Sequence, residues 1–321
     1  MKQRRHRMLI QIAIPLFAFG RLWAATTPPQ RTFASAQEAA EALITAAGSF
    51  NLPTLLDLFG PEGKELVSSA DSVQDKNNTV AFAEKARAKH KIVVDSKNPS
   101  GATLIVGEED WPFPVPLVRS NGKWAFNTAK GRDEILRRRI GTNELDAIQV
   151  CRGFVEAQME YSALAREVTG VAQYAQKIFS SPGKRDGLFW QNADGSPGGP
   201  ISKPIADALA EGYTAEAKTG YHGYYFTILK GQGPAAPLGE LDYVIKDLMI
   251  GGFALLAVPA EYGVTGIQSF MVSYDGVVYQ KDLGPDSVNL AKKVDRYNPD
   301  KTWKQTDDRW PSETAVDDGK R

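Results

Sequence analysis

The spacing of hydrophobic positions changes from a helical to a strand-like period along the first part of the chain. Apolar residues three or four positions apart predict helices over residues 36–50, 52–59 and 79–90. Ser35 and Glu38 form a capping box before the first of them. Short β-rich runs then alternate with turn residues, and the Asn121-Gly122 pair is typical of a β-hairpin. Helices followed by an antiparallel meander predict an α+β domain over residues 35–130, with its helices packed on a curved sheet.

A second helical pattern follows a charged segment. Residues 131–141 predict a helical connector between two domains, and Thr142 or Asn143 can cap the helix that comes next. One apolar stripe runs along that helix through Leu145, Ile148, Cys151, Val155 and Met159. This stripe places Cys151 in a core as a small buried hydrophobe. The β-rich runs that follow predict an antiparallel sheet packed on the helix, which gives a second α+β domain over residues 142–305.

The most regular alternation in the chain is VSYDGVVYQKDLG, residues 272–284. Apolar and polar residues alternate on both sides of Asp275-Gly276, a pair that suits the central positions of a type I′ turn. We therefore interpret Asp275 as a turn former and not as a catalytic acid, and the segment as a hairpin of the second domain.

The N-terminus differs from the rest of the chain. A basic stretch, MKQRRHRM, precedes an apolar run from Leu9 to Gly20, which is shorter than the roughly 20 residues of a membrane helix. We predict a signal peptide over residues 1–25, with an uncleaved anchor as the alternative. Residues 26–34 then form a linker, and residues 306–321 form a polar tail. The expected location is the periplasm or the exterior, with no stable membrane span after cleavage.

Composition narrows the function classes. Of the 321 residues, 42% are hydrophobic and 24% charged, which is typical of a soluble globular protein. Lys plus Arg and Asp plus Glu both total 38, so no net charge draws the protein to nucleic acid. The single cysteine excludes an intrachain disulfide framework and a thiolate metal cluster.

Several segments resemble known families. The blocks NELDAIQVCRGFVEAQMEYSA, GYHGYYFTILKGQG and FALLAVPAEYGVTGIQSFMVSYDGVVYQKDLG are similar to the globular part of type IV pilin and pseudopilin-like proteins. That resemblance implies one long helix packed on an antiparallel sheet, but a folded polar domain here replaces the membrane-resident half of a pilin helix. The element order of residues 35–130 resembles the cone-shaped nuclear-transport-factor-2-like superfamily. Residues 35–305 as a whole resemble an exported bacterial family catalogued only as a domain of unknown function.

Catalytic motifs are sparse in this sequence. It contains no paired-histidine metal motif, no G-x-S-x-G nucleophile elbow and no phosphate-binding loop. Glu108 and Asp110 stand before an aromatic-proline edge and are weak candidates for a general base, although neighbouring acids on a turn are usually solvated. His222, in GYHGYYF, is the third weak catalytic candidate.

A loop rich in oxygen ligands offers a weak calcium site. Asp186, Asn192 and Asp194 supply carboxylate and amide oxygens, but they lack the spacing of an EF-hand loop. We predict no other cofactor.

Aromatic residues offer a weak binding surface. Trp190, Tyr221 and Tyr224 are suited to stacking on a sugar or a peptide, and equally to packing in a sheet. The leading hypothesis is a non-enzymatic binding or assembly role with an envelope protein or a glycan as partner. The alternative is an enzyme of hydrolase or isomerase type that uses a cavity in the first domain.

Overall fold

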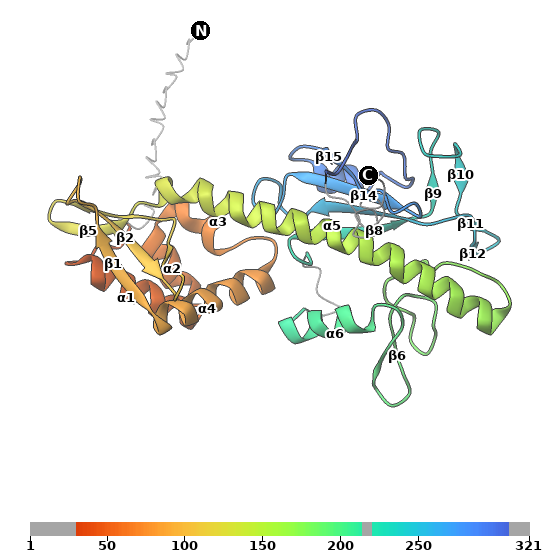
Figure 1. Ribbon diagram of the computed structural model, residues 1–321, viewed down its shortest axis with the longest axis horizontal. Coiled ribbons are helices and arrows are strands. Elements are labelled where there is room, and N and C mark those ends of the chain that lie inside the picture. Colours follow the sequence, from red (N-terminus) through yellow and green to blue (C-terminus); the bar gives the residue numbers. More distant parts are fainter. Residues whose placement is uncertain (1–29, 214–219, 308–321) are drawn as a thin grey trace, which may run out of the picture.

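Two units lie at opposite ends of one long helix, α5 (Figure 1). The computed structural model describes residues 30–213 and 220–307. The predicted signal peptide therefore lies outside the described residues, as do the first part of the linker and most of the polar tail. Each unit has its own hydrophobic core, one built from residues 33–126 and the other from residues 147–297. The predicted α+β class is confirmed.

The first unit packs four α-helices against an antiparallel sheet. Its helices are α1 (Ala36–Gly48), α2 (Leu52–Phe59), the 3-10 helix η1 (Pro61–Gly63), α3 (Lys64–Val67) and α4 (Ser72–Ala88). Its strands are β1 (His90–Val94), β2 (Gly101–Val106), β3 (Trp111–Pro112), β4 (Leu117–Ser120) and β5 (Lys123–Phe126), in the order β1-β2-β4-β5 with β3 paired to β2. Alternate residues of β2 point into the core beneath α1 and α4. The helices therefore cover one face of the sheet.

Local signals at two turns of this unit behave as the sequence predicts. The Glu38 amide donates to Ser35 Oγ at 3.1 Å, which caps α1. Asn121 and Gly122 adopt φ values of 50° and 78°, the pair of positive angles that a type I′ hairpin needs. Helix α4 begins earlier than predicted, because Asp71 caps it by accepting the Gln74 amide at 3.0 Å.

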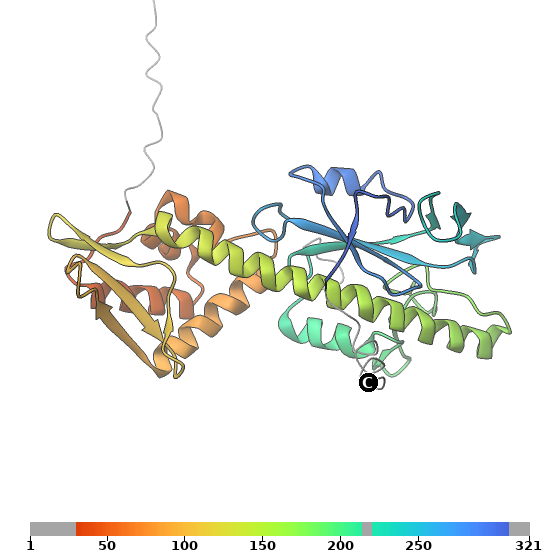
Figure 2. The ribbon, with the colours of Figure 1, turned by 45° about the horizontal axis from the view of Figure 1, so that its top comes forward.

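Helix α5 (Thr128–Thr169) runs without a break for 42 residues, about 63 Å at the rise of an α-helix. The helical state predicted for residues 131–141 is confirmed, but the prediction that a new helix begins with a cap at Thr142 or Asn143 is wrong. Asn143 lies inside the helix, where its side chain bonds to both neighbouring units instead of capping a terminus. Figure 2 shows α5 passing from the first unit into the second as one rod.

The buried face of α5 in the second unit is rotated from the predicted stripe. Ile148, Cys151 and Val155 are buried, but Leu145 is 60% exposed and Met159 44% exposed. The buried arc is centred on Cys151 and includes Gln158, which bonds the backbone of Ala175 through both its amide atoms. The core position predicted for Cys151 is confirmed, and burial raises the pKa of its thiol to about 12.

The second unit is built on the antiparallel sheet β16-β15-β14-β13-β8. Its elements are β6 (Trp190–Gln191), β7 (Pro197–Gly198), α6 (Ser202–Glu211), β8 (Tyr224–Leu229), β9 (Gly231–Gln232), β10 (Leu241–Asp242), β11 (Val244–Ile245), β12 (Leu248–Met249), β13 (Ala254–Pro259), β14 (Gln268–Ser273), β15 (Tyr279–Asp282), α7 (Ser287–Ala291) and β16 (Lys304–Gln305). Strand β13 is buried along its whole length, because it contacts α5 as well as α7. Helix α6 lies on the side of α5 away from this sheet (Figures 1 and 2).

The hairpin in residues 272–284 forms, but with a wider turn than predicted. Its last ladder pair joins Met271 and Tyr279. Gly276 has a φ of 75° and donates its amide to the Ser273 carbonyl at 3.0 Å, but Asp275 has no positive φ. The type I′ prediction is therefore wrong. Strand β14 ends at Ser273 and β15 begins at Tyr279, so residues 274–278 form the turn, and Val278 among them is 2% exposed.

No helix within residues 30–213 and 220–307 combines the length and hydropathy needed to cross a membrane.

Two glycines of α5 provide a matched test of this architecture. A Cβ at the exposed Gly141 meets nothing within 4 Å, so Gly141→Ala should stabilise the protein by about 0.5–1 kcal/mol through helix propensity. A Cβ at Gly131 lies 2.5 Å from Val115 Cα, so Gly131→Ala should destabilise it. Urea unfolding monitored by circular dichroism measures both. A loss of stability in Gly141→Ala contradicts a continuous α5.

Candidate functional site

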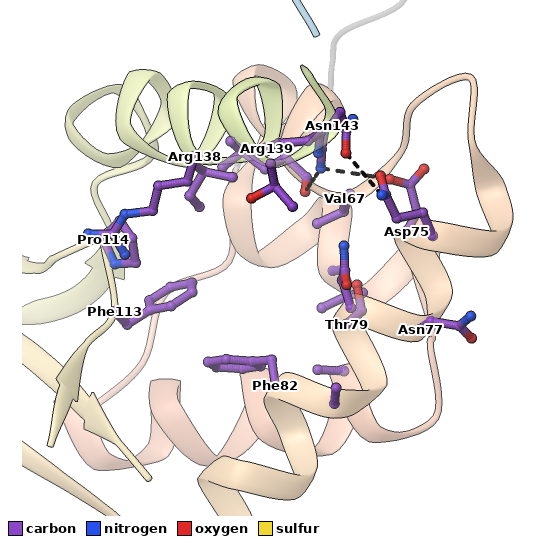
Figure 3. A pocket seen from close by; sticks show the side chains of 18 of the residues that line it. Val67, Asp75, Asn77, Thr79, Phe82, Phe113, Pro114, Arg138, Arg139 and Asn143 are labelled. Atoms are coloured by element: carbon purple, nitrogen blue, oxygen red, sulfur yellow. Dashed lines mark hydrogen bonds and ion pairs between the residues drawn. The ribbon is translucent and has the colours of Figure 1, made fainter. Parts of the chain in front are cut away.

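A pocket of about 720 Å³ lies where the first unit, α5 and the second unit meet. Figure 3 shows the part of it that the first unit and α5 form. Its apolar wall comes from the first core and includes Leu43, Leu55, Phe59, Val67, Phe82 and Phe113. Phe82 and Phe113 pack with their ring centroids 5.1 Å apart. The polar side chains of the wall are contributed by α4, α5 and the second unit. The pocket is therefore apolar on one side and charged on the other.

One face of α5 forms the roof of the pocket. Arg138, Arg139, Thr142, Asn143 and Asp146 all line it, at the spacing of residues that share a helix face. Arg138 and Asp146 are separated by about 12 Å along the helix axis. Arg138 lies over the Trp111 ring at 5.3 Å and bonds Glu134 at 2.7 Å, so its end of the pocket is next to the aromatic edge of the first unit.

A buried ion pair fixes α5 to α3 and α4. Arg139 donates to the carbonyls of Glu65 and Leu66 at 2.7 and 2.8 Å, and lies 3.7 Å from Asp75. Asp75 also accepts the Ser69 hydroxyl at 3.0 Å. Burial raises the pKa of Asp75 and lowers the pKa of Arg139, so desolvation disfavours the charge on both. Their hydrogen bonds to surrounding groups offset that cost.

The fully buried Asp71 joins the start of α4 to the second unit. One oxygen caps α4, and the other accepts the Tyr213 hydroxyl and the Gly223 amide, both at 2.8 Å. Burial, followed by the hydrogen bond to Asp71, raises the pKa of Tyr213. This carboxylate therefore holds two segments more than 140 residues away in the chain.

Asn143 makes the matching link from the middle of α5. It accepts from Gln74 Nε2 and donates to the Thr265 carbonyl, both at 2.9 Å. Gly223 has a φ of 77° and lies so close to Asn143 and Thr265 that a Cβ has no room. The two units and α5 are therefore joined through buried polar contacts at one place.

The far end of the pocket holds His222 between two carboxylates. Its Nδ1 lies 2.9 Å from Asp146 Oδ2, and its Nε2 lies 3.2 Å from Glu211 Oε2. Tyr221 stacks on the His222 ring at 4.3 Å, and Tyr213 packs edge-on against Tyr221 at 5.0 Å. We call Asp146, Glu211, Tyr213 and His222 the acidic end of the pocket, since all four line it.

Of the three catalytic candidates from the sequence, the structure brings only His222 to the pocket. Glu108 is exposed and pairs with Lys89 at 3.4 Å. Asp110 lies 3.1 Å from Lys91 and 3.4 Å from Lys89, and the hydrogen bond from Lys91 lowers the pKa of Asp110. Neither acid lines the pocket, so they do not form a general base within it.

The calcium candidates are engaged by protein groups. Asp186 accepts from Lys177 Nζ at 2.9 Å and from the Ser181 amide at 2.7 Å, and the bond from Lys177 lowers the pKa of Asp186. Asn192 accepts from the Trp190 indole, and Asp194 from the Ser196 hydroxyl. Over the part of the chain that the structure describes, no three His, Cys, Asp or Glu side chains are grouped to hold a metal.

The aromatic candidates have three different surroundings. Trp190 lies beneath Arg185 at 5.2 Å, in the β6–β7 ribbon. Tyr224 is 1% exposed and donates to the Gln268 carbonyl at 2.8 Å inside the second core. Tyr221 stacks on His222 next to the pocket. The structure does not gather them into one stacking surface.

The chain belongs to the family described as Protein of unknown function (DUF2950), whose profile matches residues 30–306. The match includes both units, all of α5 and every residue that lines the pocket. No curated protein and no solved structure matches the chain.

Replacement of Asp71 tests the junction. Asp71→Asn leaves at least one buried N–H without an acceptor, which should cost about 1–3 kcal/mol of unfolding free energy. Tyr213→Phe removes the hydroxyl that donates to Asp71 and accepts the His222 amide at 3.4 Å, and it should also cost about 1–3 kcal/mol. Tyr262→Phe, which loses an exposed hydrogen bond to Asp282, serves as the control and should change stability very little. Chemical denaturation measures all three, and wild-type stability of Asp71→Asn contradicts the assigned role.

Proposed function

We propose that this protein is an exported, non-enzymatic binding protein of the periplasm or cell envelope. The junction pocket is the proposed site, and it takes an amphipathic ligand. The observation that carries the proposal is the division of the pocket wall into an apolar side and a charged end. A volume of about 720 Å³ and an apolar lining with a few convergent polar groups are typical of small-molecule sites.

The apolar wall supplies the affinity. Phe59, Phe82 and Phe113 form a connected aromatic group in the first unit, with Phe59 and Phe113 6.3 Å apart between ring centroids. An apolar chain laid against such a wall gains roughly 25 cal/mol for each Å² removed from water. Binding of an apolar group here is therefore the simplest use of the site.

The ionisable groups around the pocket support a binding role more than a catalytic one. Arg139 donates to two backbone carbonyls, and Asp75 accepts from Ser69. His222 has a carboxylate at each ring nitrogen. These contacts connect α3, α4, α5 and α6, so the groups act first as structural links.

An acid–base enzyme of hydrolase or isomerase type is the second candidate. The 2.9 Å contact between Asp146 and His222 Nδ1 favours it, because a carboxylate at that nitrogen orients an imidazole as a general base. Glu211 stands at Nε2, where a substrate proton must arrive. Catalysis at this site therefore requires Glu211 to leave His222 when substrate binds.

The likenesses to pilins and to the nuclear-transport-factor-2-like superfamily stay predictions. The packing of α5 on the sheet of the second unit supports the first of them. The helices that cover one face of the sheet in the first unit support the second. We propose that a partner presents the ligand to the pocket. This partner is an envelope protein or a glycan that carries an apolar substituent.

Export can be tested with residues 1–25 alone. Fused to a phosphatase that needs a disulfide for activity, this segment should give active enzyme outside the cytoplasm. The double change Ile14→Asp and Phe17→Asp interrupts the apolar run and should abolish the activity. An inactive unmodified fusion contradicts export through this segment.

Binding can be tested with a ligand that fills the pocket and a variant that obstructs it. Decanol should bind the whole protein in isothermal titration calorimetry. Thr79→Trp, at a position that lines the pocket, should weaken binding about tenfold or more, since the indole occupies the space of the chain. Lys76→Trp, on an exposed position of α4 outside the pocket, should bind as the wild type does. No decanol binding to the wild type contradicts the proposed site.

A further inference from the structure

The charges along the junction pocket are unevenly placed. Arg139 is paired with Asp75, and Arg138 shares Glu134 with Arg137 at the other end of the pocket. Asp146 and Glu211 remain, and among the described residues the salt bridges of both are to His222. The three groups carry a net charge of −2 when the imidazole is neutral and −1 when it is protonated. The acidic end is therefore negative in either state.

The surroundings of Tyr221, which stacks on His222, show the same negative field. After burial, the charges of Glu211, Asp146, Asp207 and Asp71 each raise the pKa of the Tyr221 phenol. All four carboxylates disfavour a further negative charge at this ring. An anionic ligand group placed here meets the same repulsion, and a cationic group meets attraction.

Aromatic rings add a second preference for a cation. Tyr213 and His222 both line the pocket, and their rings lie 6.0 Å apart between centroids. Tyr213 is 8% exposed and donates its hydroxyl to Asp71, so its ring is fixed in place. Faces of aromatic rings attract ammonium groups, and the attraction increases in desolvated sites.

The apolar and negative parts of the pocket lie at different positions along α5. Arg138, above Trp111, marks the aromatic end, and Asp146 lies about two helical turns further on. A linear molecule parallel to α5 therefore has its apolar part beside Phe113 and its other end at Asp146.

We propose that the ligand is an amphiphile with an amine head group, whose ammonium binds Asp146 and Glu211 beside Tyr213 while its chain lies against the aromatic wall. This inference rests on the proposed function, because it assigns the charge of the ligand of the same pocket. An ammonium has three donors, and charge-assisted bonds to carboxylates are among the stronger hydrogen bonds in proteins. The side chains of Asp146 and Glu211 are 37% and 42% exposed, so both are accessible to a ligand.

The test compares three ligands with one chain length and different heads: decylamine, decanol and decanoate. Each is titrated calorimetrically into the whole protein at neutral pH and low salt, where the amine is protonated. Decylamine should bind about tenfold tighter than decanol, and decanoate more weakly than decanol, because only the head-group charge differs.

Two charge-matched double variants locate the effect. Asp146→Asn with Glu211→Gln should bring the affinity for decylamine close to the affinity for decanol in the same variant. Glu108→Gln with Asp110→Asn removes two acids outside the pocket and should keep the full preference for the amine. If the first double variant does not fold, Glu211→Gln alone should lower the preference about threefold, since one carboxylate remains.

The remaining outcomes contradict either the amine head group or the proposed binding function. Equal binding of decylamine and decanol overturns the amine head group but leaves the proposed binding function intact. If decanoate binds more tightly than decanol and decylamine, the amine head group is overturned in favour of an anionic ligand at Arg138. A preference for decylamine that persists in the Asp146 and Glu211 variants also overturns the proposed ammonium site, because the cation then binds elsewhere. If none of the three ligands binds, the proposed function itself fails.

Discussion

The unbroken path of α5 from one unit into the other is the constraint on which the fold and the pocket depend. A single helix cannot bend freely, so the face that it presents to the first core fixes the face that it presents to the second. Between the two cores, Arg139, Asn143 and Asp146 share the face that lines the junction. The pocket exists because α5 roofs a space that neither unit closes alone.

The polar contacts at the junction then select one arrangement of the units. A typical hydrogen bond contributes only about 1 kcal/mol net, but a buried polar group left unpaired costs about 1–3 kcal/mol. Asp71, Asn143 and Gly223 are all buried. Asp71 and Gly223 bond to each other across the two units, and Asn143 bonds to both units from α5. Alternative placements of the units lose several of these bonds together. The network therefore contributes more to specificity than to stability, and it keeps His222 between its two carboxylates.

Local chemistry made much of the fold predictable, whereas the site depends on distant residues. The N-cap at Ser35 and the hairpin at Asn121-Gly122 need only neighbouring residues, and the sequence identifies both, although the Glu38 side chain accepts from the Ala34 amide and not from the Ser35 amide of a full capping box. Thr142 and Asn143 misled the prediction, because a residue suited to capping a helix can equally bond sideways from its middle. Asp146 and Glu211 meet at His222 from different helices, which no local pattern indicates. One signal in the sequence could have indicated the site. Arg139, Asn143 and Asp146 follow one another at four- and three-residue spacing, which forms a polar stripe on a helix that also carries an apolar stripe.

A crystal structure of the protein with decylamine tests the central claim most directly. We expect the alkyl chain to lie beside Phe82 and Phe113, with the nitrogen within hydrogen-bond distance of Asp146 or Glu211. A chain in the same place with its nitrogen toward Arg138 contradicts the assigned polarity of the pocket. A decylamine molecule bound elsewhere, with the pocket unchanged, contradicts its assignment as the binding site.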